Sequence, residues 1–368
     1  MATKKQRSLV VCLAEIEDPR VGNGVRHDLV EVLVIAVCAI FAEVEGFRDM
    51  AAWATVKEPW LKRFLHLENG IPAHDTFNRI FQILDPKQFE RVFRLWIGGV
   101  VGALRENIAI DGKALRGSAI AGASPVHMVS AFATRLGLVL GQEKVADKSN
   151  EITAIPKLLE ALSIKGCLVS IDAMGTQREI ARCIRAMGAD YLLAVKGNQP
   201  KLHETLADGF IGEWEDVHRL VQFGHGRQVG QIYRTLPNTG QVDSEIWTGC
   251  STLGRVDSMR FENGQESELE TRYYIASGKL STAEFAAAVR DHWGIENRLH
   301  WSLDVIFGED DRRLAKDHAA QNFSLLSKMA LNLLRQDPSA STYSLRIRRK
   351  QVGWDDDRRM TLLGLTPL

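Results

Sequence analysis

The segment from Asn107 to Val195 constrains the fold most, because strand-like and helix-like patterns follow one another there in a fixed order. Alternating or continuous apolar residues predict strands at 107–111, 127–134, 137–145, 167–172 and 190–195. Apolar residues at helical spacing predict helices at 151–163 and about 176–187. The last two strands are nearly all apolar, which is typical of strands buried on both faces. The sequence therefore predicts a mixed α/β fold.

The order of three strands, helix, strand, helix and strand resembles the ribonuclease-H-like fold. In that fold the first and fourth strands lie side by side. Both of these predicted strands end in an aspartate, Asp111 and Asp172. If the strands are neighbours, the two carboxylates come within reach of one metal ion, although a fold alone does not establish a catalytic site.

A third acidic candidate, Glu296, lies in the dense stretch from His292 to Arg313, which mixes tryptophans with charged and amide side chains. Ser281 and Glu284 have the spacing of a capping box, which predicts the start of the helix that carries Glu296. Between the two parts of the core, about 210–275, short β-type segments at 219–225, 228–236, 244–250 and 272–277 predict a β-rich insertion.

Three carboxylates from two strand ends and one helix suit a centre for divalent metal. Phosphodiester cleavage needs the attacking and leaving oxygens to be stabilised, and a pair of Mg²⁺ or Mn²⁺ ions can do this. Mg²⁺ takes oxygen ligands, usually one or two carboxylates besides water and phosphate. Each acid alone is better explained as a turn or capping residue, but the three together in this topology favour a metal site. Asp304, eight residues after Glu296 on about the same helical face, is a reserve ligand or an outer-shell acid.

The chain resembles the DDE-type insertion-sequence transposases, in particular the H-repeat-associated protein family. The matching motifs cover nearly the whole chain and stand at 18–27, 72–81, 108–118, 147–152, 168–177, 190–199, 272–277 and 292–313. The resemblance implies a ribonuclease-H-like core that is interrupted by a β insertion. It also implies Asp111, Asp172 and Glu296 as the catalytic, metal-binding triad, with Mg²⁺ or Mn²⁺ as cofactor.

Two departures from the family pattern bear on DNA binding. His225, Gly226 and Arg227 lead into Gln228 instead of an acidic residue followed by an arginine, which removes charges from the insertion. The tyrosine, arginine and lysine that accompany the glutamate in better-known transposases are also absent at their usual spacing. Val289, His292 and Leu303 occupy those places.

Several residues near the three acids are candidates for contact with DNA, and each is equally explained as a solvated charge or a packing residue. The candidates are Lys113, Arg116, Lys196, Asn198, Arg227, His292, Asn297, Arg298 and His300. Trp293 and Trp301 could stack on an unpaired base, but core packing under the helix is the favoured interpretation.

The two ends of the chain suggest further DNA surfaces. Residues 1–105 read as a helical domain, a candidate DNA-binding or associated domain, in which Asp75 is expected to cap a helix. A catalytic domain at 106–340 and a basic C-terminal tail at 341–368 follow. From Arg312 to Lys350 there are nine Lys or Arg against two acids, a pattern typical of phosphate-binding surfaces. A solvated helix face is the alternative.

Composition excludes some classes of protein. Lys plus Arg equals Asp plus Glu, at 46 each, so net charge indicates no partner. Five cysteines without a CxxC pair argue against a disulfide framework or zinc cluster and favour a reducing, cytoplasmic setting. The most apolar run, Val32–Ala42, is too short to span a membrane.

The expected function is therefore DNA transposition. The chain is expected to bind the terminal inverted repeats of its element, cleave DNA and join it to target DNA, as a homodimer or a larger synaptic complex. A metal-dependent nuclease without strand transfer, and a domesticated or decayed copy that only binds DNA, remain alternatives.

Overall fold

The computed structural model describes residues 8–22, 25–119, 124–146, 149–212, 216–224, 227–262, 265–337 and 342–367. Six helices open the chain: α1 (Leu9–Leu13), α2 (Leu29–Ile40), α3 (Phe47–Val56), α4 (Glu58–Leu61), α5 (His74–Ile83) and α6 (Pro86–Val101). The helical start that the sequence predicted is confirmed. Within the described ranges no helix has both the length and the apolar character needed to cross a membrane.

Asp28 and Asp75 both lie at the start of a helix, but only Asp28 is a cap. Asp28 caps α2, because its side chain accepts a hydrogen bond from the backbone N–H of Glu31. The predicted cap at Asp75 is wrong, since α5 begins at His74 and Ala73 precedes it. Asp75 instead lies in the first turn, where a negative charge interacts favourably with the helix dipole.

The predicted order of strands and helices in the central part is confirmed. The elements are β1 (Asn107–Leu115), β2 (Val126–Ala133), β3 (Leu138–Lys144), α7 (Glu151–Glu160), β4 (Leu168–Ile171), α8 (Arg178–Ala186) and β5 (Asp190–Val195). β1 pairs antiparallel with β2 and parallel with β4, and β4 pairs parallel with β5. The first and fourth strands are therefore neighbours, as expected.

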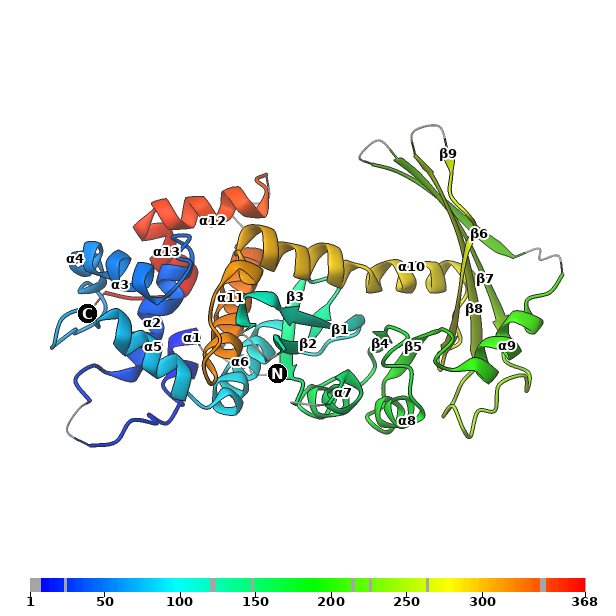
Figure 1. The fold of residues 1–368 in the computed structure, drawn as a ribbon, viewed down its shortest axis with the longest axis horizontal. Helices are drawn as coiled ribbons and strands as arrows, with labels where there is room; N and C mark the ends of the chain where they lie inside the picture. The colour runs from blue at the N-terminus through cyan, green and yellow to red at the C-terminus, as the bar shows by residue number, and fades with distance from the viewer. Residues whose placement is uncertain are drawn as a thin grey trace, which may run out of the picture.

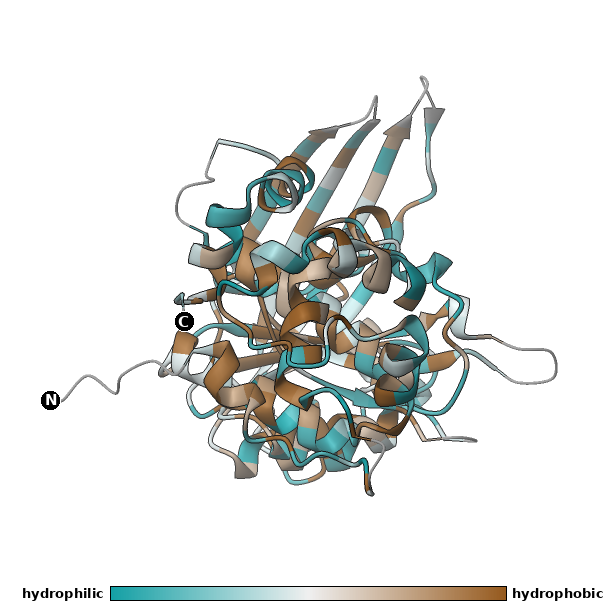
Figure 2. Cartoon of the chain, turned by 90° about the vertical axis from the view of Figure 1, so that its left-hand side faces the viewer, coloured by the Kyte–Doolittle hydropathy of each residue, from teal (hydrophilic) through white to brown (hydrophobic). Residues whose placement is uncertain are grey.

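The β-rich insertion extends the same sheet. After α9 (Pro200–Gly209) come β6 (Val217–Gly224), β7 (Arg227–Pro237), β8 (Thr252–Glu262), β9 (Gln265–Glu266) and β10 (Glu270–Ala276). The strand order is β3-β2-β1-β4-β5-β10-β8-β7-β6, with β9 on β8. The strand expected at 244–250 is wrong, because these residues form turns, and β8 was not predicted. The long strands β6–β8 rise beyond the helices, with polar and apolar residues alternating along them (Figures 1 and 2).

A long helix crosses one face of this sheet. α10 (Thr282–His292) starts at the predicted capping box of Ser281 and Glu284. It continues into two π-helical segments, Ile295–His300 and Ser302–Ile306. α10 contacts β1 and β4, whereas α7 and α8 lie on the opposite face of the sheet (Figure 1). The central strands are thus buried between two helical layers.

The C-terminal helices join the N-terminal helices in one hydrophobic core. The helices are α11 (Ala319–Gln336), α12 (Leu345–Trp354) and α13 (Asp356–Leu363). α11 contacts α2, α5 and α6 on one side and β3 on the other. The core is continuous across the boundary expected at residue 105, since it contains residues of α2, β3, α11 and α13.

The basic stretch from Arg312 to Lys350 is only in part a surface, because Arg313, Lys316 and Arg346 are exposed whereas other cations are enclosed. Arg312, Lys328 and Arg349 are all less than 10% exposed. Arg349 donates to the carbonyl of Ile40 and lies over the ring of Phe307, 4.5 Å from its centroid. Arg312 and Arg349 bind backbone carbonyls and lie over aromatic rings, and Lys328 donates to the side-chain amide oxygen of Gln142, so all three cations have partners inside the protein.

Candidate functional site

Asp111 and Asp172 stand at the point where two parallel strands part. The last paired residues of β1 and β4 are Ile110 and Ile171, and the two aspartates follow directly. β1 continues to Leu115, whereas β4 ends at Ile171. The edge of β1 from Asp111 onward is therefore no longer covered by β4, and both half-buried carboxylates lie beside this opening.

The loop after Asp172 is held by hydrogen bonds on both sides. The Asp172 carboxylate accepts from the backbone N–H of Gly175, at 3.2 Å. Thr176 donates its hydroxyl to the carbonyls of Asp172 and Ala194. The side-chain amide of Asn198 donates to the carbonyl of Ala173, at 2.7 Å. Asn198, a DNA-contact candidate in the sequence, thus already uses its amide to position the loop beside Asp172.

Glu296 approaches from the helical layer. It is exposed on the π-helical segment Ile295–His300, which contacts β1. Ile295 and Leu299 are fully buried and fix this segment against the core. π-helical turns are rare and often occur at functional sites, because the extra residue per turn redirects the side chains.

The charges of three other acids act on Asp111, and we call these four residues the carboxylate cluster: Asp111, Glu151, Asp172 and Glu296. The pKa of Asp111 is raised to about 8, first by burial and then by repulsion from Asp172, Glu151 and Glu296. The backbone N–H of Gly112 opposes this rise only in part. Without a cation, repulsion from the other three carboxylates disfavours the ionised form of Asp111.

Two histidines of the same stretch line the cluster. His300 Nδ1 lies 3.5 Å from Asp111 Oδ2, and His292 shares a hydrogen bond with the hydroxyl of Ser170 in β4. Burial lowers the pKa of each to about 4. Both rings are therefore neutral near pH 7. They face the protein interior, and a contact with DNA stays a prediction for each.

A second acidic group surrounds Lys113, which follows Asp111 by two residues on β1. We call Lys113, Asp304, Glu309 and Asp310 the lysine cluster. The Lys113 ammonium lies 2.7 Å from Asp304 and Asp310 and 3.3 Å from Glu309. Its side chain is 11% exposed, so its charge is already used within the protein. Asp304, the reserve ligand, binds this lysine.

The other DNA-contact candidates are mostly on the surface. The side chain of Arg116 is 82% exposed and lies near Asp310, and Lys196 is exposed. Asn297 and Arg298 are exposed but bind backbone carbonyls, those of Trp293 and Thr134. Arg227 begins β7, but its side chain and His225 lie outside the described residues.

The tryptophans of this stretch differ in their surroundings. Trp293 is half-buried under the guanidinium of Arg272, 5.2 Å from its ring centroid. Trp301 is 54% exposed. The prediction that Trp301 packs in the core is therefore wrong.

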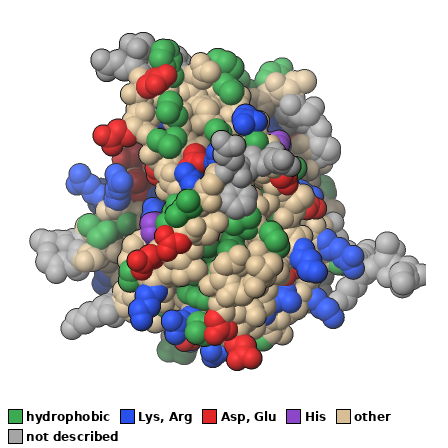
Figure 3. Space-filling view, turned by 90° about the vertical axis from the view of Figure 1, so that its right-hand side faces the viewer, with side chains coloured by type: hydrophobic (Ala, Val, Ile, Leu, Met, Phe, Trp, Pro, Cys, Tyr) green, Lys and Arg blue, Asp and Glu red, His purple; other side chains and the backbone are tan. Residues whose placement is uncertain are grey.

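The charged side chains on the outer face of the sheet do not form a patch of a single sign. Figure 3 shows Lys and Arg side chains interspersed there with Asp and Glu side chains and with apolar patches. Phe223 of β6 and Phe261 of β8 are both exposed, and each is paired across the strands with Gln228 of β7.

The residues of the carboxylate cluster fit a divalent cation by their chemistry and charge. All four offer oxygen ligands, which Mg²⁺ and Mn²⁺ prefer. A bound cation would also relieve the repulsion that raises the pKa of Asp111. Within the described part of the chain, however, no three His, Cys, Asp or Glu side chains already stand in a metal-binding arrangement.

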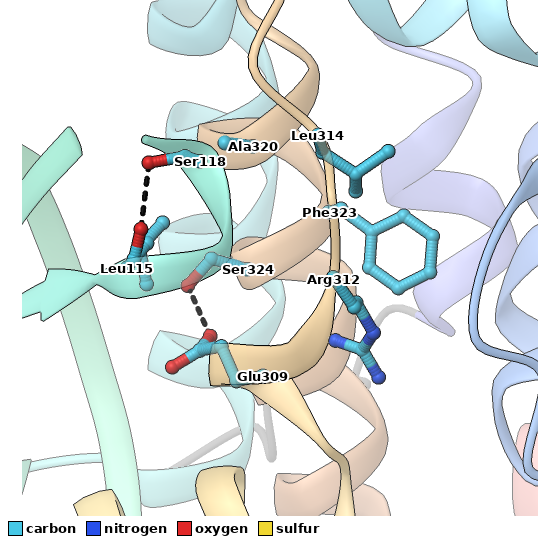
Figure 4. Close-up of a pocket in the computed structure, with 8 residues that line it drawn as sticks. All are labelled: Leu115, Ser118, Glu309, Arg312, Leu314, Ala320, Phe323 and Ser324. Atoms are coloured by element: carbon cyan, nitrogen blue, oxygen red, sulfur yellow. Dashed lines mark hydrogen bonds between the residues drawn. The ribbon is translucent and has the colours of Figure 1, made fainter. Parts of the chain in front are cut away.

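The cavity next to the lysine cluster is part of the packing. Figure 4 shows Ser324 donating to Glu309 and Ser118 donating to the carbonyl of Leu115 around it. Its volume is about 10 Å³, enough for a single water at most. It is too small for a substrate.

Two residues of the site were not predicted from the sequence. Glu151 Oε1 lies 2.6 Å from His127 Nε2, at hydrogen-bond distance, and both side chains lie beside Gly112. The motif at 147–152 contains Glu151, but a glutamate 40 residues after Asp111 gives no spacing signal of its own. Asp147 and Lys148 of that motif lie outside the described residues.

Comparison with known proteins identifies relatives along nearly the whole chain. The family described as "Transposase DDE domain" matches residues 103–333, and one described as "DDE_Tnp_1-associated" matches residues 10–97. The chain is 36% identical over 357 residues to the "H repeat-associated putative transposase YhhI" of Escherichia coli K12, which covers 94% of each chain. It is 40% identical to the "Putative transposase YncI" of Escherichia coli O157:H7, covering 89% of this chain and 87% of that one.

Among solved structures, the chain is similar to a piggyBac transposase in a synaptic complex with hairpin DNA. The identity is 10% and the TM-score 0.43, over 96% of this chain and 75% of the other. This similarity is too weak to establish the fold, so the fold assignment rests on the strand order.

Proposed function

The chain belongs to the DDE transposase family, and on this premise we propose that it is the DNA transposase of an insertion sequence. In this proposal it binds the terminal inverted repeats of its element, cleaves the DNA and joins the freed ends to target DNA. The observation that carries the proposal is the parallel pairing of β1 with β4, which brings Asp111 and Asp172 to one opening in the sheet.

We propose Asp111, Asp172 and Glu296 as the catalytic triad, in a ribonuclease-H-like core. The strand order β3-β2-β1-β4-β5 and the helical layers on both faces support this core. The electrostatic effect of Asp172 and Glu296 on Asp111 supports the triad. The triad would hold Mg²⁺ or Mn²⁺, which supplies Lewis-acid stabilisation of the attacking and leaving oxygens when bound.

The protein's own groups prepare this centre. Gly175 and Asn198 hold the loop that carries Asp172, so its carboxylate is pre-oriented. Neutral His300 beside Asp111 adds no positive charge that would compete with a cation. Preorganised charge of this kind is worth more at a partly buried site than in water.

DNA would lie across the open edge of β1. We propose that four exposed side chains contact its phosphates, Arg116, Lys196, Asn297 and Arg298, together with Arg227 at the start of β7. Trp301, 54% exposed one residue after the first π-helical segment, adds a flat surface on which a base could stack. Lys113, His292 and His300 are turned to internal partners and would act on DNA indirectly, through the shape of the site.

Joining two ends of one element requires both ends to be held together. We therefore propose that the active form is a homodimer or a larger synaptic complex.

The test is incubation of the purified protein with Mg²⁺ and a DNA that carries the element's flanking repeats. Joined products are expected. Cut products without joining would indicate a nuclease, and a shifted but uncut DNA would indicate a binding protein. Binding should also fall on the order of 10³-fold between 50 and 200 mM salt if six or more phosphates are contacted. A flat salt response would contradict the proposed phosphate contacts.

A further inference from the structure

We propose that the edge strand β6 pairs antiparallel with β6 of a second copy of this chain, so that the two sheets join across a two-fold axis. This inference rests on the proposed function, because it supplies the contact of the proposed homodimer. The observations behind it are an open strand edge, exposed apolar side chains on that strand and a sequence that can pair with itself.

The two edges of the sheet differ in what covers them. At one edge, α11 contacts β3, and the side chain of Asn332 bonds both the backbone N–H and the carbonyl of Val139. At the other edge, β6 pairs with β7 and with no other strand among those described. An open edge presents unpaired N–H and carbonyl groups to any strand that approaches. β6 can therefore accept a further strand.

β6 lacks the features that usually prevent strands from pairing at an edge. It contains no proline or lysine, and it pairs with β7 without a bulge. Its only Lys, Arg, Asp or Glu residue is Arg219. The outer ends of β6–β8 rise beyond the helices (Figure 1), and residues 221–223 of β6 are exposed.

Apolar side chains lie at this open edge. Val221 is 50% exposed and Phe223 is 79% exposed, and both point to one face of the sheet. The register places Met259 and Phe261 of β8 level with them on the same face, two strands further from the edge. A strand added beside β6 would cover Val221 and Phe223 and so remove apolar surface from water.

The sequence of β6 favours one register of pairing with itself. A two-fold axis at Leu220 places Leu220 opposite its own copy and Phe223 opposite Val217, so apolar side chains meet. Arg219 then faces Val221, and no like charges stand opposite each other. An axis at Arg219 would oppose two arginines, and an axis at Val221 would place Phe223 opposite Arg219. The expected axis is therefore at Leu220.

Pairing through β6 ends at two copies. A two-fold contact uses the same surface on both copies and closes, whereas a head-to-tail contact can continue into a filament. β6 is used up when it pairs with its own copy, and α11 contacts the other edge at β3. DNA is the other occupant to consider, but β6 offers phosphates a single cation, Arg219.

The dimer Kd of the full-length protein without DNA, measured by sedimentation over a concentration series, tests this pairing. Val221→Lys places a lysine opposite Arg219 of the other copy, on both sides of the axis, and should raise the Kd at least about tenfold. Val221→Glu is equally polar but faces Arg219 with the opposite charge, so its Kd should rise less than about threefold. Met259→Lys is the matched control on the same face, and its Kd should equal that of the wild type.

Three outcomes would overturn the inference. The first is a wild type that is monomeric at every concentration measured. The second is a dimer that Val221→Lys leaves intact, or that Val221→Lys, Val221→Glu and Met259→Lys all weaken equally. The third is a monomeric wild type whose DNA binding rises in Val221→Lys and falls in Val221→Glu, which would make this edge a DNA surface.

A cross-link keeps the test informative if the variants at position 221 do not fold. In the expected register, cysteines in Leu220→Cys lie opposite each other, with about 4.5–5.5 Å between Cα atoms, a distance that a disulfide spans. Oxidation by copper phenanthroline should give a covalent dimer on a non-reducing gel. Gln222→Cys is the matched control, because it faces His218 in this register and should stay uncoupled. The wild type, whose five cysteines are buried or half-buried, should give none. A covalent dimer from Gln222→Cys but not from Leu220→Cys would overturn the register.

DNA joining measured on the same preparations separates this inference from the proposed function. A dimer that depends on β6 but joins no DNA would support the inference and contradict the proposed function. A wild type that joins DNA but forms no dimer through β6 would overturn the inference alone.

Discussion

The carboxylate cluster and the lysine cluster lie along the same strand, and they differ in what neutralises them. Lys113 stands among three carboxylates and contacts each within 3.3 Å. Two residues earlier, burial and then repulsion from three further acids raise the pKa of Asp111 to about 8. Lys113 neutralises one acidic group from within the chain, whereas in the proposed function a divalent cation would neutralise the other.

This difference indicates that the two clusters on β1 serve different purposes, one for folding and one for function. The lysine cluster fastens β1 to the second π-helical segment, which carries Asp304, and to the short helix Glu309–Asp311 that follows it. In the carboxylate cluster, repulsion between the acids disfavours the ionised, metal-free state. Residues that repel one another without a ligand commonly mark functional sites.

The largest expected effect is on catalysis. Asp111→Asn, Asp172→Asn and Glu296→Gln should each lower DNA cleavage by about 10³-fold or more, because each removes several kcal/mol of stabilisation by the metal. DNA-end binding should stay nearly unchanged in a mobility-shift assay. Cleavage that survives in one variant would remove that residue from the triad.

A second prediction concerns pH and the metal-free protein. Asp111 has a pKa of about 8 in the folded state, against about 4 in the unfolded chain. Its contribution to stability is therefore fully present below about pH 4 and is lost as the pH rises to about 8. Relative to Asp111→Asn, the wild type should lose about 2–4 kcal/mol of unfolding free energy between pH 5 and 8.

Urea denaturation of the two proteins in chelator measures this difference, and other titrating groups largely cancel between them. Added Mn²⁺ should flatten the pH dependence of the wild type. Identical pH profiles without metal would mean that the carboxylates do not repel one another as described.

Breaking the lysine cluster should have a similar or smaller effect, this time on stability. Lys113→Met leaves three acids without their cation and should lower the unfolding free energy by about 2–4 kcal/mol. Lys62→Met is the control, since Lys62 pairs with Glu58 at the surface and should change stability by less than about 1 kcal/mol. Equal effects of the two substitutions would contradict the structural role of Lys113.

The smallest effect is expected for Asp304. Asp304→Asn leaves Lys113 with Glu309 and Asp310, so cleavage should fall less than about threefold and stability by about 1 kcal/mol or less. Initial cleavage rates and urea midpoints measure the two. A loss of cleavage as large as that of Asp172→Asn would place Asp304 in the carboxylate cluster instead.

Asp111 and Asp172 could be found from the sequence because strand order determines which strand ends meet. The neighbouring β1 and β4 were predicted from the succession of strands and helices, and family membership is confirmed. Asp304 pairs with Lys113, a contact that the sequence spacing from Glu296 does not indicate, and its role as a reserve ligand or outer-shell acid stays a prediction.

Other features depend on contacts between distant segments and leave no local pattern. Glu151 and His127 are 24 residues apart and meet only because α7 folds over β2. Arg312, Lys328 and Arg349 read as surface cations, but α11 is covered on both sides and α12 packs onto it. Amino-acid type predicts exposure on average and fails where a whole helix is enclosed.

The shared core of the N-terminal and C-terminal helices has a consequence for synthesis of the protein. α2 is almost wholly buried, and α11 is among the helices that cover it. At the pace of translation, α11 leaves the ribosome some tens of seconds after α2. During that interval the apolar surface of α2 is without this partner, so a nascent chain that stalls before residue 319 presents a site for chaperones or for aggregation.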